Sequence, residues 1–175
     1  LIGRICFPAM IWLVLRGELP LPAQADLFGA VLVSAVDHGP QAPAIAIARM
    51  AITCGIGING AMASGVNALG DVHGGAGQQC MGLIADIAAR QDQGASLDAA
   101  VAAGVDAFRA EHGRFVPGFG HRFHTVDPRA VRLSELVRAA VQAGTVKGRH
   151  LAIAEAVQSY LSLGKKQTIA MNIDG

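Results

Sequence analysis

His73 lies in a glycine-rich stretch, DVHGGAGQQ, directly before a segment with helical periodicity. Glycines on both sides of the histidine remove steric cover and expose backbone N–H groups at a helix start, which suits an anionic or polar ligand. No Lys-Ser/Thr pair follows, so the stretch is not a P-loop. Local features leave two interpretations open: a ligand-binding turn, or a tight connection that happens to contain a histidine.

A second stretch, VPGFGHRFHTVDPR (residues 116–129), concentrates polar chemistry in an otherwise apolar chain. Gly118 and Gly120 precede His121, and Arg129 falls in the first turn of the next helical segment. An arginine fork matches a carboxylate or phosphate, so we expect an anionic organic substrate here. His121 and His124 have the separation of metal ligands, but no nearby cysteine or carboxylate pair completes a set. We therefore expect no metal site.

Two further polar residues stand near the ends of apolar segments. His38 ends a helical pattern at VDHGP, where a histidine usually interacts favourably with the C-terminal end of a helix. Asp174 follows an apolar stretch in MNIDG. On local grounds alone Asp174 is a turn residue.

Eight segments carry helical patterns, and none alternates as a half-buried strand does. Ser96 and Asp127 are expected helix N-caps, with Pro128 in the first turn after Asp127. In one segment Met81, Ile84, Ile87 and Ala88 are expected to share a buried face. The sequence predicts an all-α fold, a multi-helical bundle with tightly packed Gly/Ala-rich helices, whose segments span residues 8–20, 22–39, 42–55, 58–70, 77–94, 96–113, 127–144 and 148–164.

Residues 55–70 carry an unusual number of small side chains. GIGING at 55–60 has the glycine spacing of a dinucleotide-binding turn, but that motif needs a preceding strand, and helical patterns flank it on both sides. We expect close helix packing instead. Such packing indicates either a central helix or a subunit interface.

Composition excludes several classes of function. A net charge of +1 with only 5% aromatic residues argues against nucleic acid and anionic membrane surfaces as partners. The longest apolar run, ICFPAMIWLVL, is too short to span a bilayer. Cys6, Cys54 and Cys80 form no CxxC pattern, so we expect free, mostly buried thiols in a reducing cytoplasm. The chain lacks an initiating methionine and begins inside an apolar pattern, so we expect a piece of a longer protein.

DVHGGAGQQ, VPGFGHRFHTVDPR and MNIDG, in this order, resemble the citrate synthase family. LVLRGELP and DHGPQAPAIAIAR extend the resemblance over essentially the whole chain. It implies an all-α homodimer with a large domain and a smaller, mobile domain. Residues 1–175 would form a single citrate synthase-like core that lacks the family's N- and C-terminal parts, and about residues 95–165 resemble the small domain.

The resemblance also implies roles for individual residues. Asp174 would be the base that takes a proton from the acyl-CoA methyl group. His73 would hydrogen-bond the thioester oxygen, and a donor at this position is worth roughly 3 to 4 kcal/mol in the chemical step. His121 would polarise the oxoacid carbonyl and protonate the new alkoxide, and His38 and Arg129 would hold the oxoacid. Coenzyme A is substrate here and no cofactor is implied; its expected contacts are Val116, Pro117, Gly118, Phe119, Gly120 and Arg122.

The spacing of one motif departs from common citrate synthases. His121 and Arg129 are one residue closer, and the usual basic residue before Asp-Pro-Arg is missing, which leaves Arg122 or His124 to replace it. The residues of these motifs are most similar to those of compact family members called citryl-CoA lyase. We therefore expect cleavage of citryl-CoA to acetyl-CoA and oxaloacetate. The alternatives are a citrate or 2-methylcitrate synthase, which condenses acetyl-CoA or propionyl-CoA with oxaloacetate, and a non-catalytic relative that binds acyl-CoA or only oligomerises.

Overall fold

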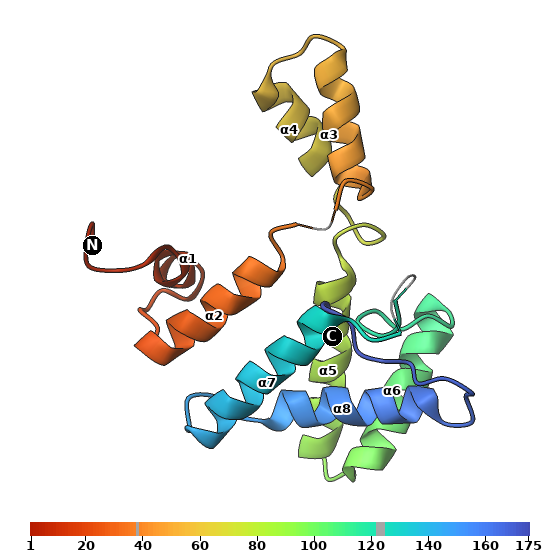
Figure 1. Cartoon of the computed structure of the whole chain (residues 1–175). Helices are drawn as coiled ribbons and strands as arrows, with labels where there is room; N and C mark the ends of the chain where they lie inside the picture. The colour runs from red at the N-terminus through yellow and green to blue at the C-terminus, as the bar shows by residue number, and fades with distance from the viewer. Residues whose placement is uncertain (38, 122–124) are drawn as a thin grey trace.

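The computed structural model describes residues 1–37, 39–121 and 125–175 of the chain. Over these residues it contains eight helices and no β-strand, only two isolated bridges, which confirms the all-α prediction (Figure 1). The helices are α1 (Phe7–Arg16), α2 (Pro22–Ser34), α3 (Pro43–Thr53), α4 (Ile58–Val66), α5 (Ala76–Asp92), α6 (Leu97–His112), α7 (Pro128–Gln142) and α8 (Arg149–Ser162).

Local sequence explains where these helices begin. α1, α2, α3 and α7 each have proline in their first two positions, where its fixed φ suits the helix and its missing N–H costs nothing. Ser96 caps α6 by accepting a hydrogen bond from the Ala99 N–H at 3.3 Å, and Asp127 caps α7 in the same way. Both predicted caps are confirmed.

Three helices end four or five residues earlier than the predicted segments. α1 ends at Arg16 rather than near Pro20, α2 at Ser34 rather than near Gly39, and α4 at Val66 rather than near Gly70. Beyond α2, the Asp37 carboxylate accepts a hydrogen bond from the Gly39 N–H at 2.8 Å. Such local side-chain bonds compete with continuation of a helix.

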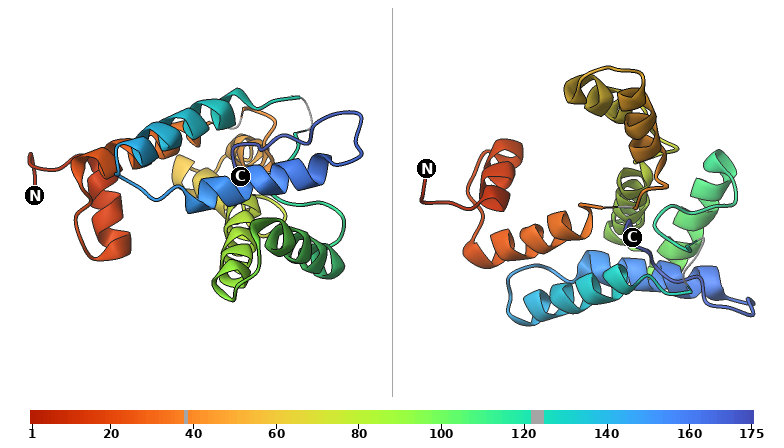
Figure 2. Two further views of the ribbon diagram at one scale, coloured as in Figure 1. Left: turned by 90° about the horizontal axis from the view of Figure 1, so that it is seen from below. Right: turned by 45° about the horizontal axis from the view of Figure 1, so that its top comes forward.

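α5, α6 and α8 surround the hydrophobic core, and together with α7 we call them the α5–α8 body (Figure 2). α7 is joined to α8 by an ion pair between Arg138 and Glu155, and α7 also lies against α2. Side chains from three helices meet at the centre, each at most 2% exposed: Ile87, Val101, Val105, Ile153 and Val157.

The buried face of α5 differs from the prediction at one residue. Met81 is 73% exposed, whereas Cys80 and Leu83 are buried together with Ile87. Both sets have helical spacing, so the pattern alone did not distinguish them. The thiols also differ from the expectation: Cys80 is buried, but Cys6 and Cys54 are exposed because each lies just beyond a helix end.

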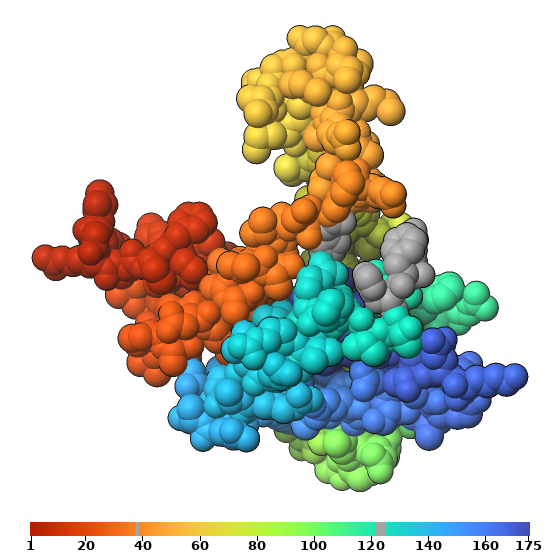
Figure 3. All heavy atoms as spheres, in the orientation of Figure 1, coloured from red at the N-terminus to blue at the C-terminus, as the bar shows by residue number. Residues whose placement is uncertain are grey.

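α3 and α4 form a helical hairpin, residues 43–66, that stands clear of the α5–α8 body (Figure 3). A Cβ atom added to Gly65 would lie 2.9 Å from the Ala44 carbonyl oxygen, so the small residue allows the two helices to approach closely. Close helix packing at this segment is therefore confirmed. The first three residues of GIGING, 55–57, lie in the connection between the two helices, and the last three form the first turn of α4. Among the described residues α4 packs mainly on α3, so it does not take the place of a central helix there.

Across the described ranges, no helix is both long enough and apolar enough to pass through a membrane.

Candidate active site

His73 lies in a tight turn before α5. Gly70 and His73 exchange two backbone hydrogen bonds, of 2.8 and 3.2 Å. The His73 side chain accepts a bond at Nε2 from the Ala44 N–H, 3.0 Å away, at the start of α3. Since an accepting nitrogen carries no proton, the neutral ring must hold its proton on Nδ1. His73 is therefore held as a neutral hydrogen-bond donor.

Asp174 lies in a tight turn between Asn172 and Gly175. Its own N–H donates to the Asn172 Oδ1 at 2.9 Å, and the Gly175 N–H donates to the Asn172 carbonyl at 3.2 Å. The Asp174 carboxylate reaches the first turn of α5, since its Oδ1 lies 3.8 Å from a Cβ built on Gly77. Asp174 and His73 are thus both at the N-terminal end of α5.

The loop of residues 116–120 runs beside the C-terminal segment, residues 169–175. The Gly120 N–H donates to the Ala170 carbonyl at 2.7 Å, and the Asn172 N–H donates to the Gly118 carbonyl at 2.9 Å. His121 follows directly after this paired stretch. Of the five loop residues expected to contact coenzyme A, Val116 and Gly118 are buried and Pro117, Phe119 and Gly120 are half-buried.

Gly118 is required by its surroundings. Its φ of +85° lies in the region that favours glycine. A Cβ atom there would lie 2.6 Å from the Cys80 Sγ and 2.9 Å from the Gly175 Cα. A Cβ on Gly175 would in turn collide with the Gly118 carbonyl oxygen. These two glycines allow the loop, α5 and the end of the chain to meet.

Arg129 projects from the start of α7 and is held by Asp127. Its Nε and Nη2 donate to the two Asp127 carboxylate oxygens at 3.1 and 2.9 Å, and its backbone N–H donates at 3.0 Å. Asp127 also accepts a bond from the Ile173 N–H at 3.1 Å. The carboxyl group, only 1% exposed, therefore joins α7 to the segment that carries Asp174.

The electrostatics of this pair follow from these contacts. Burial acts to raise the pKa of Asp127, but the bonds from Arg129 and Ile173 outweigh it, so the pKa lies below its ordinary value. The bond to Asp127 raises the pKa of Arg129, with a smaller contribution from Asp174. Arg129 is 30% exposed and close enough to Asp174 to interact with its charge. It can therefore turn its remaining surface toward a ligand.

Two residues of this region were missed by the sequence analysis. Cys80 lies against Gly118, and its burial, together with the Asp174 charge, raises the thiol pKa to about 11. Asp127 was predicted only as a helix cap. The Asp-Pro-Arg order itself could have indicated the second role, since it places an arginine two residues after the capping carboxylate.

The structure thus brings four of the expected elements to one place. His73, Asp174, Arg129 and the loop before His121 gather where α5 and α7 begin. Figure 1 shows these two helix starts beside the C-terminal end of the chain. The expected roles of His38 and Arg122, and of His124 as a substitute, fall outside the described residues.

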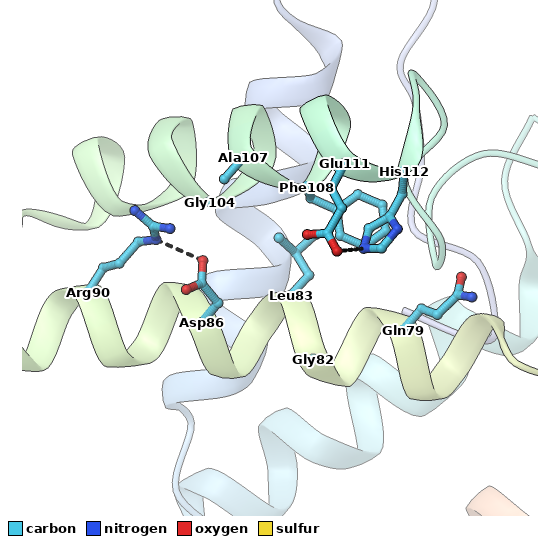
Figure 4. A pocket seen from close by; sticks show the side chains of 10 residues that line it. All are labelled: Gln79, Gly82, Leu83, Asp86, Arg90, Gly104, Ala107, Phe108, Glu111 and His112. Carbon is cyan, nitrogen blue, oxygen red and sulfur yellow. Dashed lines mark hydrogen bonds and ion pairs between the residues drawn. The ribbon is translucent and has the colours of Figure 1, made fainter. Parts of the chain in front are cut away.

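A groove of about 400 Å³ between α5 and α6 lies apart from these residues (Figure 4). Its charged side chains pair with one another. Asp86 and Arg90 are 2.7 Å apart, and Glu111 and His112 are 3.8 Å apart. None of His73, His121 and Asp174 lines it. Within the part of the chain that the structure describes, no group of three His, Cys, Asp or Glu side chains could hold a metal ion.

Comparison with known proteins identifies the class. Residues 7–174 match the family described as citrate synthase, C-terminal domain. The citryl-CoA lyase of Hydrogenobacter thermophilus is 31% identical, with a TM-score of 0.83 over 99% of this chain and 64% of that one. No curated protein matches. The chain belongs to the citrate synthase family, as the motifs indicated.

More distant structures share the fold. The ATP citrate lyase of Methanothrix soehngenii is 20% identical, with a TM-score of 0.76 over 99% of this chain and 26% of that one. The citrate synthase of Pyrobaculum aerophilum is 23% identical, with a TM-score of 0.67 over 97% of this chain and 41% of that one. The chain therefore spans less than two thirds of the length of each of these proteins.

Proposed function

We propose that this chain forms part of a citryl-CoA lyase that cleaves citryl-CoA to acetyl-CoA and oxaloacetate. The observation that carries the proposal is the placement of His73 and Asp174 at one helix end, with the His121 loop bonded to the Asp174 segment. The 31% identity to the lyase of Hydrogenobacter thermophilus favours cleavage as the direction.

In the proposed reaction His121 removes the proton of the citryl hydroxyl group. The carbon–carbon bond then breaks, the oxaloacetate carbonyl forms, and the electron pair moves into an enolate of acetyl-CoA. His73 donates from Nδ1 to the enolate oxygen, and protonated Asp174 delivers a proton to the methylene carbon. A neutral donor fixed where negative charge develops stabilises the transition state. The bond from Ala44 supports this role for His73, because it leaves Nδ1 as the donor.

Substrate binding follows the same assignment. Arg129 and His38 would hold the oxoacid carboxylates, and the guanidinium fork of Arg129 suits this task. The loop of residues 116–120 and Arg122 would lie along coenzyme A, which enters as a thioester substrate. The proposal assigns no separate cofactor and no metal.

The test uses the full-length protein. Citryl-CoA is supplied, and acetyl-CoA and oxaloacetate are measured; in parallel, acetyl-CoA and oxaloacetate are supplied and thiol release is measured. We expect cleavage. Condensation with thiol release and no cleavage would show a synthase, and propionyl-CoA in the same assay would show a 2-methylcitrate synthase.

Two variants test the catalytic assignment in the same assays. His121→Ala and Asp174→Ala should abolish turnover while circular dichroism shows a retained helical fold. Unchanged turnover in either variant contradicts its role. A wild-type protein that binds acetyl-CoA but turns over neither substrate pair would be the non-catalytic relative.

For the domain organisation we propose a smaller, mobile domain that corresponds to the α5–α8 body. The resemblance to the family implied a small domain at about residues 95–165. α5 shares its core with α6 and α8, which supports a boundary at the turn of residues 70–75. The site residues His73 and Asp174 would then lie at the edge of the moving part.

We also propose a homodimer in which the α3–α4 hairpin contacts a second copy. Support comes from apolar side chains that the hairpin exposes, which are Ile47, Met50, Ile52, Ile58, Met62 and Val66. A cytoplasmic location is proposed as well, because all three cysteines are free thiols, a state that a reducing compartment maintains.

A further inference from the structure

Asn172 joins the two segments that carry the proposed proton-transfer groups. Its Nδ2 donates to the Gly120 carbonyl at 2.7 Å, and Gly120 directly precedes His121. Its Oδ1 accepts from the Asp174 N–H at 2.9 Å. One side-chain amide therefore connects the backbone beside His121 to the backbone of Asp174.

We infer that Asn172 is a positioning residue that sets the placement of Asp174 relative to His121 in the reaction proposed above. The residue acts through the two backbone segments and is given no contact with substrate. The inference rests on the proposed function for its catalytic consequence. The two Asn172 side-chain bonds, to Gly120 and to Asp174, are a property of the fold, and we call them the Asn172 bridge.

The chemistry of the amide makes the residue type specific. A flipped amide would place Oδ1 against the Gly120 carbonyl and the amino group against the Asp174 N–H, so only one orientation satisfies both partners. Aspartate keeps the acceptor and loses the donor. Alanine loses both. Glutamine has both groups on a stem one methylene longer.

Other bonds hold the same segment but do not make this connection. The Met171 N–H donates to Gln158 on α8 at 2.7 Å, and the Ile169 N–H donates to Ser162 at 3.0 Å. The Ile173 N–H donates to Asp127 at the start of α7. These bonds fix the segment to the helices.

The backbone bonds to the loop are made at Gly118 and Gly120 by main-chain atoms, and they persist in any Asn172 variant. Replacement of Asn172 should therefore keep the loop paired with the C-terminal segment, while the backbone at Gly120 and the turn at Asp174 each lose one restraint. A displacement of about 1 Å in a catalytic group can cost about 100-fold in rate. We expect the loss to appear in kcat rather than in KM.

The test compares four forms of the full-length protein: wild type, Asn172→Ala, Asn172→Asp and Thr168→Ala. Thr168 is an exposed residue just before the same segment and serves as the matched control. For citryl-CoA cleavage we expect kcat of Asn172→Ala to fall about 100-fold. KM should change less than about 3-fold, because the main-chain bonds remain. Thr168→Ala should behave as wild type.

A second measurement does not depend on activity. Amide hydrogen exchange is followed by mass spectrometry in peptides that cover residues 116–121 and 170–175. We expect faster exchange of both peptides in Asn172→Ala. In Asn172→Asp, residues 116–121 should exchange faster while the 170–175 peptide stays closer to wild type, since aspartate keeps the acceptor for the Asp174 N–H.

The outcomes separate the two hypotheses. If wild type turns over neither substrate pair, the proposed function fails. The exchange measurement alone then decides whether the Asn172 bridge holds the two segments together. Wild-type kcat in Asn172→Ala, or wild-type exchange in both peptides, overturns the positioning role. If Asn172→Ala does not fold, the kcat and exchange of the folded Asn172→Asp protein decide in its place.

Discussion

The His73 ring shows how one backbone contact fixes which ring nitrogen can donate a hydrogen bond. The Ala44 N–H that donates to its Nε2 belongs to the first turn of α3, where helix N–H groups have no partner within the helix. A neutral histidine can stabilise an enolate by donating a hydrogen bond to its oxygen while keeping the proton.

The first prediction follows from this geometry. His73→Ala in the full-length protein should lower kcat for citryl-CoA cleavage by about 10²- to 10³-fold, because one donor to the developing oxyanion is removed. KM should change little. His150→Ala, an exposed histidine at the start of α8, is the matched control and should retain wild-type kcat. A His73→Ala enzyme with wild-type kcat would remove His73 from the proposed chemistry.

At the scale of elements, the Asp127 carboxylate at the start of α7 joins this helix to the C-terminal segment. Asp127 caps the helix, pairs with Arg129 and binds the Ile173 N–H with a single carboxylate. Because the pKa of Asp127 is lower in the folded protein, folding favours its ionised form. The stabilisation it gives is complete above the unfolded carboxyl pKa of about 3.9. It is lost as the pH falls through the lower, folded value.

Asp127→Asn should therefore destabilise the protein at neutral pH by about 2 kcal/mol, the usual contribution of hydrogen bonds to a charged group. The difference from wild type should stay constant down to about pH 4. It should shrink as the pH falls from the unfolded carboxyl pKa of about 3.9 toward the lower folded value, because wild type then loses the same carboxylate on protonation. Urea unfolding at several pH values measures this convergence. The control is Asp98→Asn, which changes an exposed carboxylate in the first turn of α6. A pH-independent difference for Asp127→Asn would argue against the ion pair.

The same elements show how far the sequence could be used for prediction. Ser96, Asp127 and the helix-starting prolines act through neighbours a few residues away, so helix positions could be predicted from local chemistry. The burial of Cys80 in place of Met81 depends on how α5 meets the loop around Gly118, and helical spacing does not encode that choice. The motifs identified the family.

Contacts between distant segments were beyond such prediction. His73 is bonded to Ala44, 29 residues earlier, and Asn172 to Gly120, 52 residues earlier. Asn172 lies in MNIDG, a motif in which the residue types indicated a role for Asp174 only. A pattern of residue types gives no distance between such partners, so their hydrogen bonds appear only once the helices are packed.

At the scale of the whole molecule, the chain divides into an α1–α2 arm, the α3–α4 hairpin and the α5–α8 body (Figure 1). The hairpin carries large apolar side chains that its own chain leaves exposed. Met62 on α4 is 63% exposed, and Met50 on α3 is 71% exposed. A second copy of the chain can remove such apolar surface from water, since a twofold contact pairs the same patch on both subunits.

The last prediction tests the proposed homodimer interface at the α3–α4 hairpin. Met62→Glu in the full-length protein should raise the dimer Kd by at least about tenfold, because it places a carboxylate in an apolar contact at a cost above about 1.4 kcal/mol. Sedimentation equilibrium over a range of concentrations measures the Kd. Met81→Glu is the matched control, since Met81 is also an exposed methionine (73%) but lies on α5 outside the hairpin. It should leave the Kd at its wild-type value. Equal weakening by both substitutions would point to a general effect of added charge, and a wild-type Kd for Met62→Glu would place the interface elsewhere.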